Sequence, residues 1–239
     1  MADGLTFFLD EDRGWLARPG TQGNPGSIYR TTDGGASWER VFMTAGTAPM
    51  AVGFATPEIG WLGNLNFLTQ PPEAPLYETL DGGESWHDVS ARIEGPVAAG
   101  MNGIFVLDRD NIFAVGRFIG PAHFMRSNDG GATWKSSDLA PLANGLVDVH
   151  FFDRLNGVAV GGVGENRGVF QTVVLRTEDG GDSLSADTGW VASERVIYRT
   201  NDGGLSWSES TFGENVNRIR FLPSRRGYAA GQLVYRFNP

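Results

Sequence analysis

Short apolar runs recur along the chain at a nearly constant distance, and polar, glycine-rich turns separate them. In the first repeat these runs cover residues 5–8, 15–17, 28–31 and 38–41. Runs of this length, rich in Val, Ile, Phe, Trp and Tyr and bounded by turn residues, are typical of short strands. Each repeat therefore predicts one small antiparallel sheet of four strands, and no segment has the longer period of a helix.

The turn before the last strand of each repeat carries one eight-residue pattern, Ser/Thr-x-Asp-Gly-Gly-x-Ser/Thr-Trp. Its aspartates are Asp33, Asp81, Asp129, Asp179 and Asp202, and its closing tryptophans are Trp38, Trp86, Trp134 and Trp207, with Leu184 in the fourth copy. An aspartate can accept hydrogen bonds from backbone amides of its own turn, and paired glycines permit positive φ. Five copies of such a turn indicate structural hairpins rather than five reaction centres.

The repeats divide the chain into units of about 5–41, 50–89, 101–139, 146–184, 185–210 and 216–239, which we expect to form one domain over residues 1–239. A lone four-stranded sheet cannot bury its two apolar faces, whereas sheets placed around an axis bury them against neighbours. The predicted fold is therefore all-β, a closed β-propeller of about six blades. An open β-solenoid is the less favoured alternative, because it needs shorter repeats.

The fourth and fifth units depart from the period. Neighbouring aspartates of the turn pattern are 48, 48 and 50 residues apart, but Asp202 follows Asp179 by only 23. A final strand of unit four and a first strand of unit five are therefore predicted to be missing or fused, which abbreviates the blades near residues 184–200. The last unit lacks its own Asp-Gly-Gly turn, so the blade at the C-terminus is also abbreviated.

One phenylalanine recurs six residues before the glycine of the second strand, or before the residue at that position. The five copies are Phe8, Phe54, Phe105, Phe151 and Phe221. An aromatic residue held at one repeat position predicts core packing between blades.

Composition excludes several functions. The net charge of −9 disfavours nucleic acid as a partner, because coating a phosphate backbone requires a basic surface. The chain has no cysteine, hence no disulfide and no thiolate metal site. No apolar run approaches the roughly 18–20 residues of a membrane helix, and the first residues do not have the pattern of a signal peptide.

These residues carry a resemblance to a known family. The turn pattern resembles the Asp-box, or bacterial neuraminidase repeat. The longer pattern, Gly-Trp-x-x-Gly followed by Ile-Tyr-Arg-Thr-Thr-Asp-Gly-Gly-x-Ser-Trp, resembles the photosystem II stability and assembly factors and their bacterial relatives, over residues 5–237. The resemblance implies a non-enzymatic scaffold that binds a protein or peptide, including a membrane-protein complex. It also implies a place outside the cytoplasm: periplasm, extracellular space or thylakoid lumen. The abbreviated blades prevent a full transfer of that family's partner surface.

A sialidase-like glycoside hydrolase, or a glycan-binding propeller, is the main alternative. A sialidase needs three arginines around the substrate carboxylate and a tyrosine–glutamate pair. The arginines Arg30, Arg126, Arg176, Arg199 and Arg236 instead occupy one repeat position, which favours a structural column of ion pairs over a substrate clamp. The histidines His87, His123 and His150 lie in different units. We therefore expect no enzyme, no catalytic residue, no metal and no cofactor.

Two sets of residues are candidates for partner binding. Long loops opposite the Asp-Gly-Gly turns carry Phe67, Phe118, Ile119 and Phe170. These side chains either anchor a protein or peptide partner or fold back over the blades. A basic set comprises Arg218, Arg220, Arg225 and Arg226. These side chains either hold an acidic partner segment or a small anion, or form ion pairs across the ring closure, which is the favoured interpretation. We expect a monomer.

Overall fold

The computed structural model describes most of the chain. Its ranges are residues 5–20, 25–44, 48–65, 74–96, 100–116, 121–163, 171–186, 189–192, 197–202, 206, 208–209, 216–221, 227–231 and 234–237. For the strands at 189–192, 216–221, 227–231 and 234–237 only the backbone is described. The described ranges hold strands in six sheets and one 3-10 turn, η2 (Ser90–Arg92), but no α-helix.

The first four sheets each contain four antiparallel strands in chain order. The first two sheets consist of β1 (Leu5–Phe8), β2 (Gly14–Arg18), β3 (Ser27–Thr31) and β4 (Glu39–Met43), then β5 (Ala48–Phe54), β6 (Gly60–Leu65), β7 (Leu76–Thr79) and β8 (His87–Asp88). The next two consist of β10 (Gly103–Val106), β11 (Ile112–Gly116), β12 (His123–Ser127) and β13 (Trp134–Asp138), then β14 (Gly145–Phe151), β15 (Gly157–Val163), β16 (Gln171–Thr177) and β17 (Ser185–Ala186). A short strand, β9 (Ile93–Glu94), pairs in parallel with β13.

The last two sheets have three strands each: β18 (Gly189–Ala192), β19 (Ile197–Thr200) and β20 (Ser208–Glu209), then β21 (Val216–Phe221), β22 (Gly227–Gly231) and β23 (Val234–Phe237). The fifth sheet begins with the Gly-Trp strand, so it lacks a first strand among the described residues. The fourth sheet does have its final strand, because β17 pairs with β16. The expectation of a missing final strand in unit four is therefore wrong; that strand is reduced to two residues.

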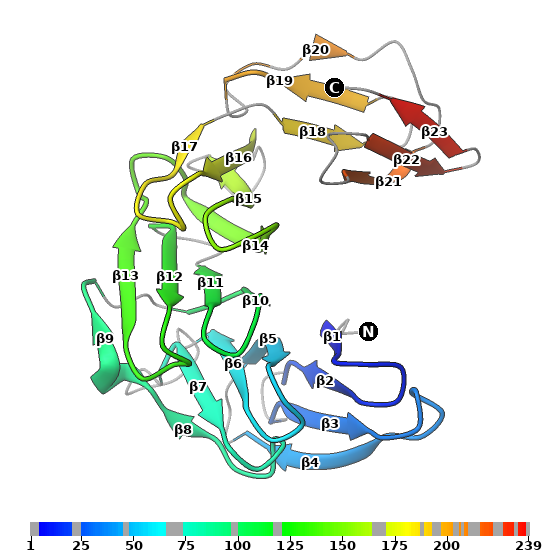
Figure 1. Cartoon of the computed structure of the whole chain (residues 1–239), viewed down its shortest axis with the longest axis vertical. Coiled ribbons are helices and arrows are strands. Elements are labelled where there is room, and N and C mark those ends of the chain that lie inside the picture. The colour runs from blue at the N-terminus through cyan, green and yellow to red at the C-terminus, as the bar shows by residue number, and fades with distance from the viewer. Residues whose placement is uncertain are drawn as a thin grey trace.

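The sheets follow one another around an arc, with the first strands β1, β5, β10 and β14 on its inner side (Figure 1). Three hydrophobic clusters fill the spaces between the first and second, second and third, and third and fourth sheets. Trp15, Trp61 and Phe113, from second strands, are almost completely buried there. The core therefore lies between blades, as expected for sheets with two apolar faces.

Among the described residues the arc does not close into the predicted ring. The last sheet packs on the fifth through β21 and β18, and no comparable packing joins it to the first sheet in the described part of the chain. β1 and the last sheet lie apart at the open side of the arc (Figure 1). In the second to fourth blades the first strand packs against the preceding blade. The fifth sheet lacks that strand, so the regular stacking is interrupted where the arc would have to continue.

The recurring phenylalanine is an interior residue in two blades. Phe54 lies opposite Gly60 and Phe151 opposite Gly157, and each ring covers that glycine. The Phe54 ring stacks on Trp15 of the preceding blade at 3.6 Å between centroids. The Phe151 ring stacks on Phe113 of the preceding blade at 3.5 Å.

The prediction of core packing is wrong at one of the five copies, Phe8. Phe8 covers Gly14 in the same manner but remains 45% exposed, because the described residues place no blade in front of the first sheet. In the third blade the phenylalanine stands one strand position earlier, and Phe105 is half-buried against the hydrophobic cluster between the third and fourth blades. Val106 pairs with Ile112, and Phe105 pairs with Phe113 on the other face of β10. Phe221 pairs with Gly227, and its side chain lies outside the described residues.

The predicted fold class is confirmed: the chain is a β-propeller with incomplete blades near residues 184–200 and at the C-terminus.

Candidate partner-binding site

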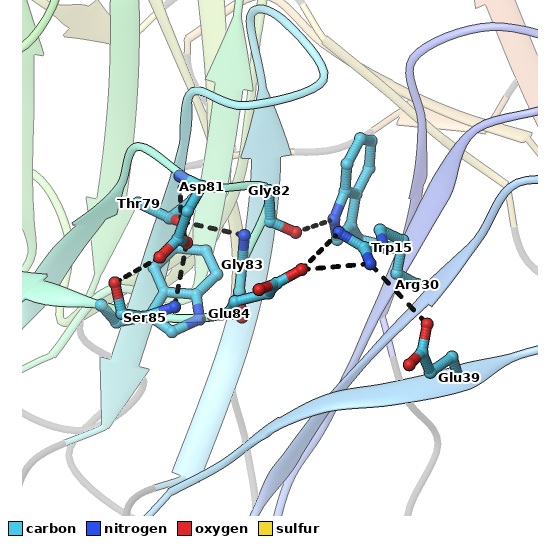
Figure 2. A network of polar contacts seen from close by, with 10 residues as sticks. Trp15, Arg30, Glu39, Thr79, Asp81, Gly82, Gly83, Glu84 and Ser85 are labelled. Carbon is cyan, nitrogen blue, oxygen red and sulfur yellow. Dashed lines mark hydrogen bonds and ion pairs between the residues drawn. The ribbon is translucent and has the colours of Figure 1, made fainter.

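The Asp-Gly-Gly hairpins join the third and fourth strands and are closed by a repeated set of hydrogen bonds. In the second hairpin Thr79 Oγ1 donates to Asp81 Oδ1 at 2.7 Å, and the amide of Gly83 donates to Thr79 Oγ1 at 2.9 Å (Figure 2). Ser85 donates its amide to Asp81 Oδ1 and its hydroxyl to Oδ2. Gly82 and Gly83 have φ of 76° and 96°, which only glycine adopts without strain. The hairpins at Asp33, Asp129 and Asp179 repeat this set.

These hydrogen bonds hold the aspartates ionised. Donation from the Ser37 hydroxyl and amide and from Thr31 lowers the pKa of Asp33 to about 2. Donation from Ser206 and Thr200 lowers the pKa of Asp202 to about 2. At Asp81 burial acts in the opposite direction, but the hydrogen bonds outweigh it and the pKa is again about 2. The carboxylates are fully occupied within their own turns, so they have little capacity left for a ligand.

Side chains of one blade reach the hairpin of the next, and we call these contacts latches. Between the first and second blades, Trp15 Nε1 donates to the carbonyl of Gly82 at 2.9 Å, and Arg30 lies 3.4 Å from Glu84 (Figure 2). Between the third and fourth blades, Arg126 donates to the carbonyl of Gly180 at 2.6 Å and pairs with Asp182. Arg30 and Arg126 therefore connect blades, whereas Arg176 pairs with Glu178 of its own hairpin at 2.7 Å.

The latch between the second and third blades has a different composition. Glu78 occupies the repeat position of Arg30 and Arg126, and its side chain is only 11% exposed. Arg92, from η2, pairs with Glu78 at 2.9 Å and donates to the carbonyl of Gly131 at 2.7 Å. The guanidinium that contacts the third hairpin thus comes from η2 and not from the third strand of the second sheet.

A cleft of about 240 Å³ lies beside the first latch, lined by Arg13, Trp15, Arg30, Pro57, Glu58 and Gly82. Its two cations already have partners. Arg13 pairs with Asp10 at 2.6 Å, and Arg30 lies near Glu84 and Glu39. With both guanidinium groups neutralised and Glu58 on the wall, the cleft offers little attraction for an anion.

A second candidate surface lies on the inner side of the arc and is largely apolar. Phe105, His150 and Phe152 form it, with Asp148 on the same face of β14 as His150, and we call it the β14 patch. The His150 ring lies edge to face with Phe105 at 4.6 Å and with Phe152 at 5.1 Å. Val147 is 43% exposed and Phe152 is 48% exposed. Because Phe152 adjoins the His150 and Phe105 rings and is not an isolated exposed residue, this surface is the candidate for partner contact among the described residues.

The local sequence explains why Val147, His150 and Phe152 are outside the core, whereas Phe105 packs partly against it. A register shift between Leu146 and Asp148 places Val147 in a bulge of β14. His150 and Phe152 flank the buried Phe151 and therefore point to the other face of the strand. The consecutive aromatics Phe151 and Phe152 are a sequence signal that this segment has an apolar side chain on each face. The repeat pattern does not include this signal.

The structure does not describe most of the residues that the sequence suggested for partner binding. Phe67, Phe118, Ile119, Phe170, Arg225 and Arg226 lie outside the described residues. Arg218 and Arg220 lie on β21, the first strand of its sheet, opposite Ala230 and Tyr228, and their side chains are not described. Both sets remain predictions.

Within the described ranges no group of three or more His, Asp or Glu side chains is placed to hold a metal ion. No helix of the described chain is long and apolar enough to cross a membrane.

No family model matches the sequence, and no curated protein matches it. Solved structures do match. YCF48 from Cyanidioschyzon merolae is 17% identical over 95% of this chain and 77% of its own, with a TM-score of 0.51. A GH74 xyloglucanase from Xanthomonas campestris is 13% identical over 96% of this chain, with a TM-score of 0.56. This chain spans 43% of the xyloglucanase. At these identities the likeness concerns the fold, which both neighbours share with this chain: a β-propeller.

Proposed function

We propose that this chain is a non-enzymatic scaffold of the Asp-box type that binds an extended protein or peptide segment outside the cytoplasm, as its resemblance to photosystem II assembly factors implies. The observation that carries the proposal is the β14 patch. An extended segment with apolar side chains suits it, because Phe105, His150 and Phe152 offer aromatic rings that already lie against one another. The rigid latched blades behind the patch keep these side chains in place.

The glycosidase alternative receives less support from the described residues. Arg30, Arg126 and Arg176 each pair with a carboxylate at a hairpin, Arg176 with Glu178 at 2.7 Å, and they sit on three different blades. A substrate carboxylate clamp needs arginines that converge on one point.

A peptide array tests the proposal. Fluorescently labelled wild-type protein is applied to an immobilised library of random extended peptides and compared with Phe152→Ser. The matched control is Leu80→Ser, because Leu80 is 58% exposed and lies in the second hairpin, away from the patch. We expect selective binding of peptides with aromatic or aliphatic side chains, retained by Leu80→Ser and reduced at least about tenfold by Phe152→Ser. Equal binding by both variants, or hydrolysis of a fluorogenic sialoside or of xyloglucan by the wild type, would contradict it.

A further inference from the structure

The β14 patch places a carboxylate beside its aromatic rings. Asp148 and His150 stand two residues apart on β14, with the buried Val149 between them, so both side chains leave the same face of the strand. The ring of His150 in turn lies against those of Phe105 and Phe152. The patch therefore combines one acidic group with three rings on the inner side of the arc.

The carboxylate of Asp148 receives little support from the protein. Its Oδ1 accepts the amide of Val149 at 2.9 Å, and no Lys or Arg of the described ranges forms an ion pair with it. The side chain is exposed, but the strands around it reduce its hydration. This desolvation raises the pKa of Asp148 in spite of the neighbouring His150, which acts in the opposite direction. An incoming cation would thus supply the opposite charge that this carboxylate needs.

The third blade fixes the backbone that carries this carboxylate. Asn102 donates from Nδ2 to the carbonyl of Leu146 at 3.0 Å, at the bulge of β14. Gly103 of β10 lies so close to β14 that a Cβ there would stand 3.0 Å from the Cα of Asp148. Because Phe105 is also on β10, its ring and the carboxylate are held in a fixed relation. Such a surface loses little conformational freedom when a ligand binds.

We propose that the β14 patch recognises its partner segment through an arginine that binds Asp148, next to an apolar side chain that packs on the rings. The inference rests on the proposed function and adds the chemistry of the partner. Arginine suits the site because its planar guanidinium pairs with a carboxylate and also stacks on aromatic faces. Side chains on one side of an extended segment are two positions apart, as Asp148 and His150 are. One residue should therefore separate the arginine from the apolar residue.

Fluorescence anisotropy with two labelled peptides tests the inference. Both have the sequence Gly-X-Ser-Phe-Ser-X-Gly, where X is arginine in one peptide and citrulline, its uncharged analogue, in the other. In about 0.15 M salt, where the screening length is about 8 Å, we expect the wild type to bind the arginine peptide about three- to tenfold more tightly. Asp148→Asn keeps a side-chain oxygen for the amide of Val149, and it should lower this ratio to about one.

A matched charge variant separates this site from general attraction, because the whole chain has a net charge of −9. Glu39→Gln also removes one negative charge, but Glu39 is 75% exposed on β4 of the first blade. We expect it to keep the wild-type ratio. An equal reduction in Asp148→Asn and Glu39→Gln, or a wild-type ratio of about one, would overturn the inference. In either case, weaker binding by Phe152→Ser would still support the proposed function. If neither peptide binds the wild type, the proposed function and the inference both fail.

Discussion

At the scale of single residues, the hydroxyl two positions before the aspartate organises each hairpin. Thr79 Oγ1 both donates to Asp81 and accepts the amide of Gly83, which is buried. Thr31, Ser127 and Thr177 act in the same way in their hairpins. Ser and Thr are interchangeable here because only the hydroxyl is used, which explains the Ser/Thr alternation of the repeat.

Thr79→Val keeps the shape of the side chain and removes its oxygen. The amide of Gly83 then loses its acceptor in a buried place, and we expect the free energy of unfolding to fall by about 1–3 kcal/mol. Ser85→Ala removes an exposed hydroxyl of the same hairpin and should cost less, below about 1 kcal/mol. Urea denaturation followed by tryptophan fluorescence measures both. A loss for Thr79→Val no larger than that for Ser85→Ala would refute the role of the buried amide.

At the scale of elements, the same side chain contributes differently in different blades because the neighbouring blade decides its burial. Phe54→Ala removes a ring that is 1% exposed and stacked on Trp15, so we expect a loss of about 3–5 kcal/mol. Phe8→Ala, at the same repeat position, should cost about 1 kcal/mol or less in dilute solution, since nearly half of the ring is already exposed. Guanidinium unfolding of the two variants compares them. Similar losses would mean that the first blade is covered in solution.

The second latch makes a further prediction at this scale. Arg92→Gln leaves the carboxylate of Glu78, 11% exposed, without its guanidinium. We expect a loss of about 2–4 kcal/mol, somewhat less than for a fully buried pair. The double variant Glu78→Gln/Arg92→Gln removes the unpaired charge and should recover more than half of that loss. Thermal unfolding of the three proteins in a double-mutant cycle gives the coupling; a double variant as unstable as the sum of both single variants would contradict the pairing.

At the scale of the whole molecule, the repeat pattern predicted the strands and turns within each repeat, but it did not predict the contacts between neighbouring blades. The Asp-Gly-Gly turns and the period gave the sheets and their order. The exposure of Phe8 and the open arc were not visible, because they depend on which neighbour a blade has rather than on its own residues. The one-residue shift of Phe105 does have a sequence signal, because Asn111 stands six residues after it, where Gly60 and Gly157 follow Phe54 and Phe151. The β14 patch was missed for a different reason: His150 and Phe152 vary between repeats, and variable positions fall outside a repeat pattern.

The hairpins also predict that the whole molecule loses stability over one range of acid pH. The pKa values of Asp33, Asp81 and Asp202, about 2, lie below the ordinary value of 3.8. The folded state therefore binds fewer protons than the unfolded state, and the stability from these carboxylates is complete above about pH 4 and lost as the pH falls toward 2. Since the hairpins sit on different blades and titrate in the same window, the loss should be steep. Urea midpoints at about pH 6, 4 and 3 should stay level at first and then drop. Asp81→Asn should begin less stable at pH 6 and fall less steeply, because one titrating hairpin is gone. An unchanged slope in that variant would place the acid sensitivity outside the hairpins.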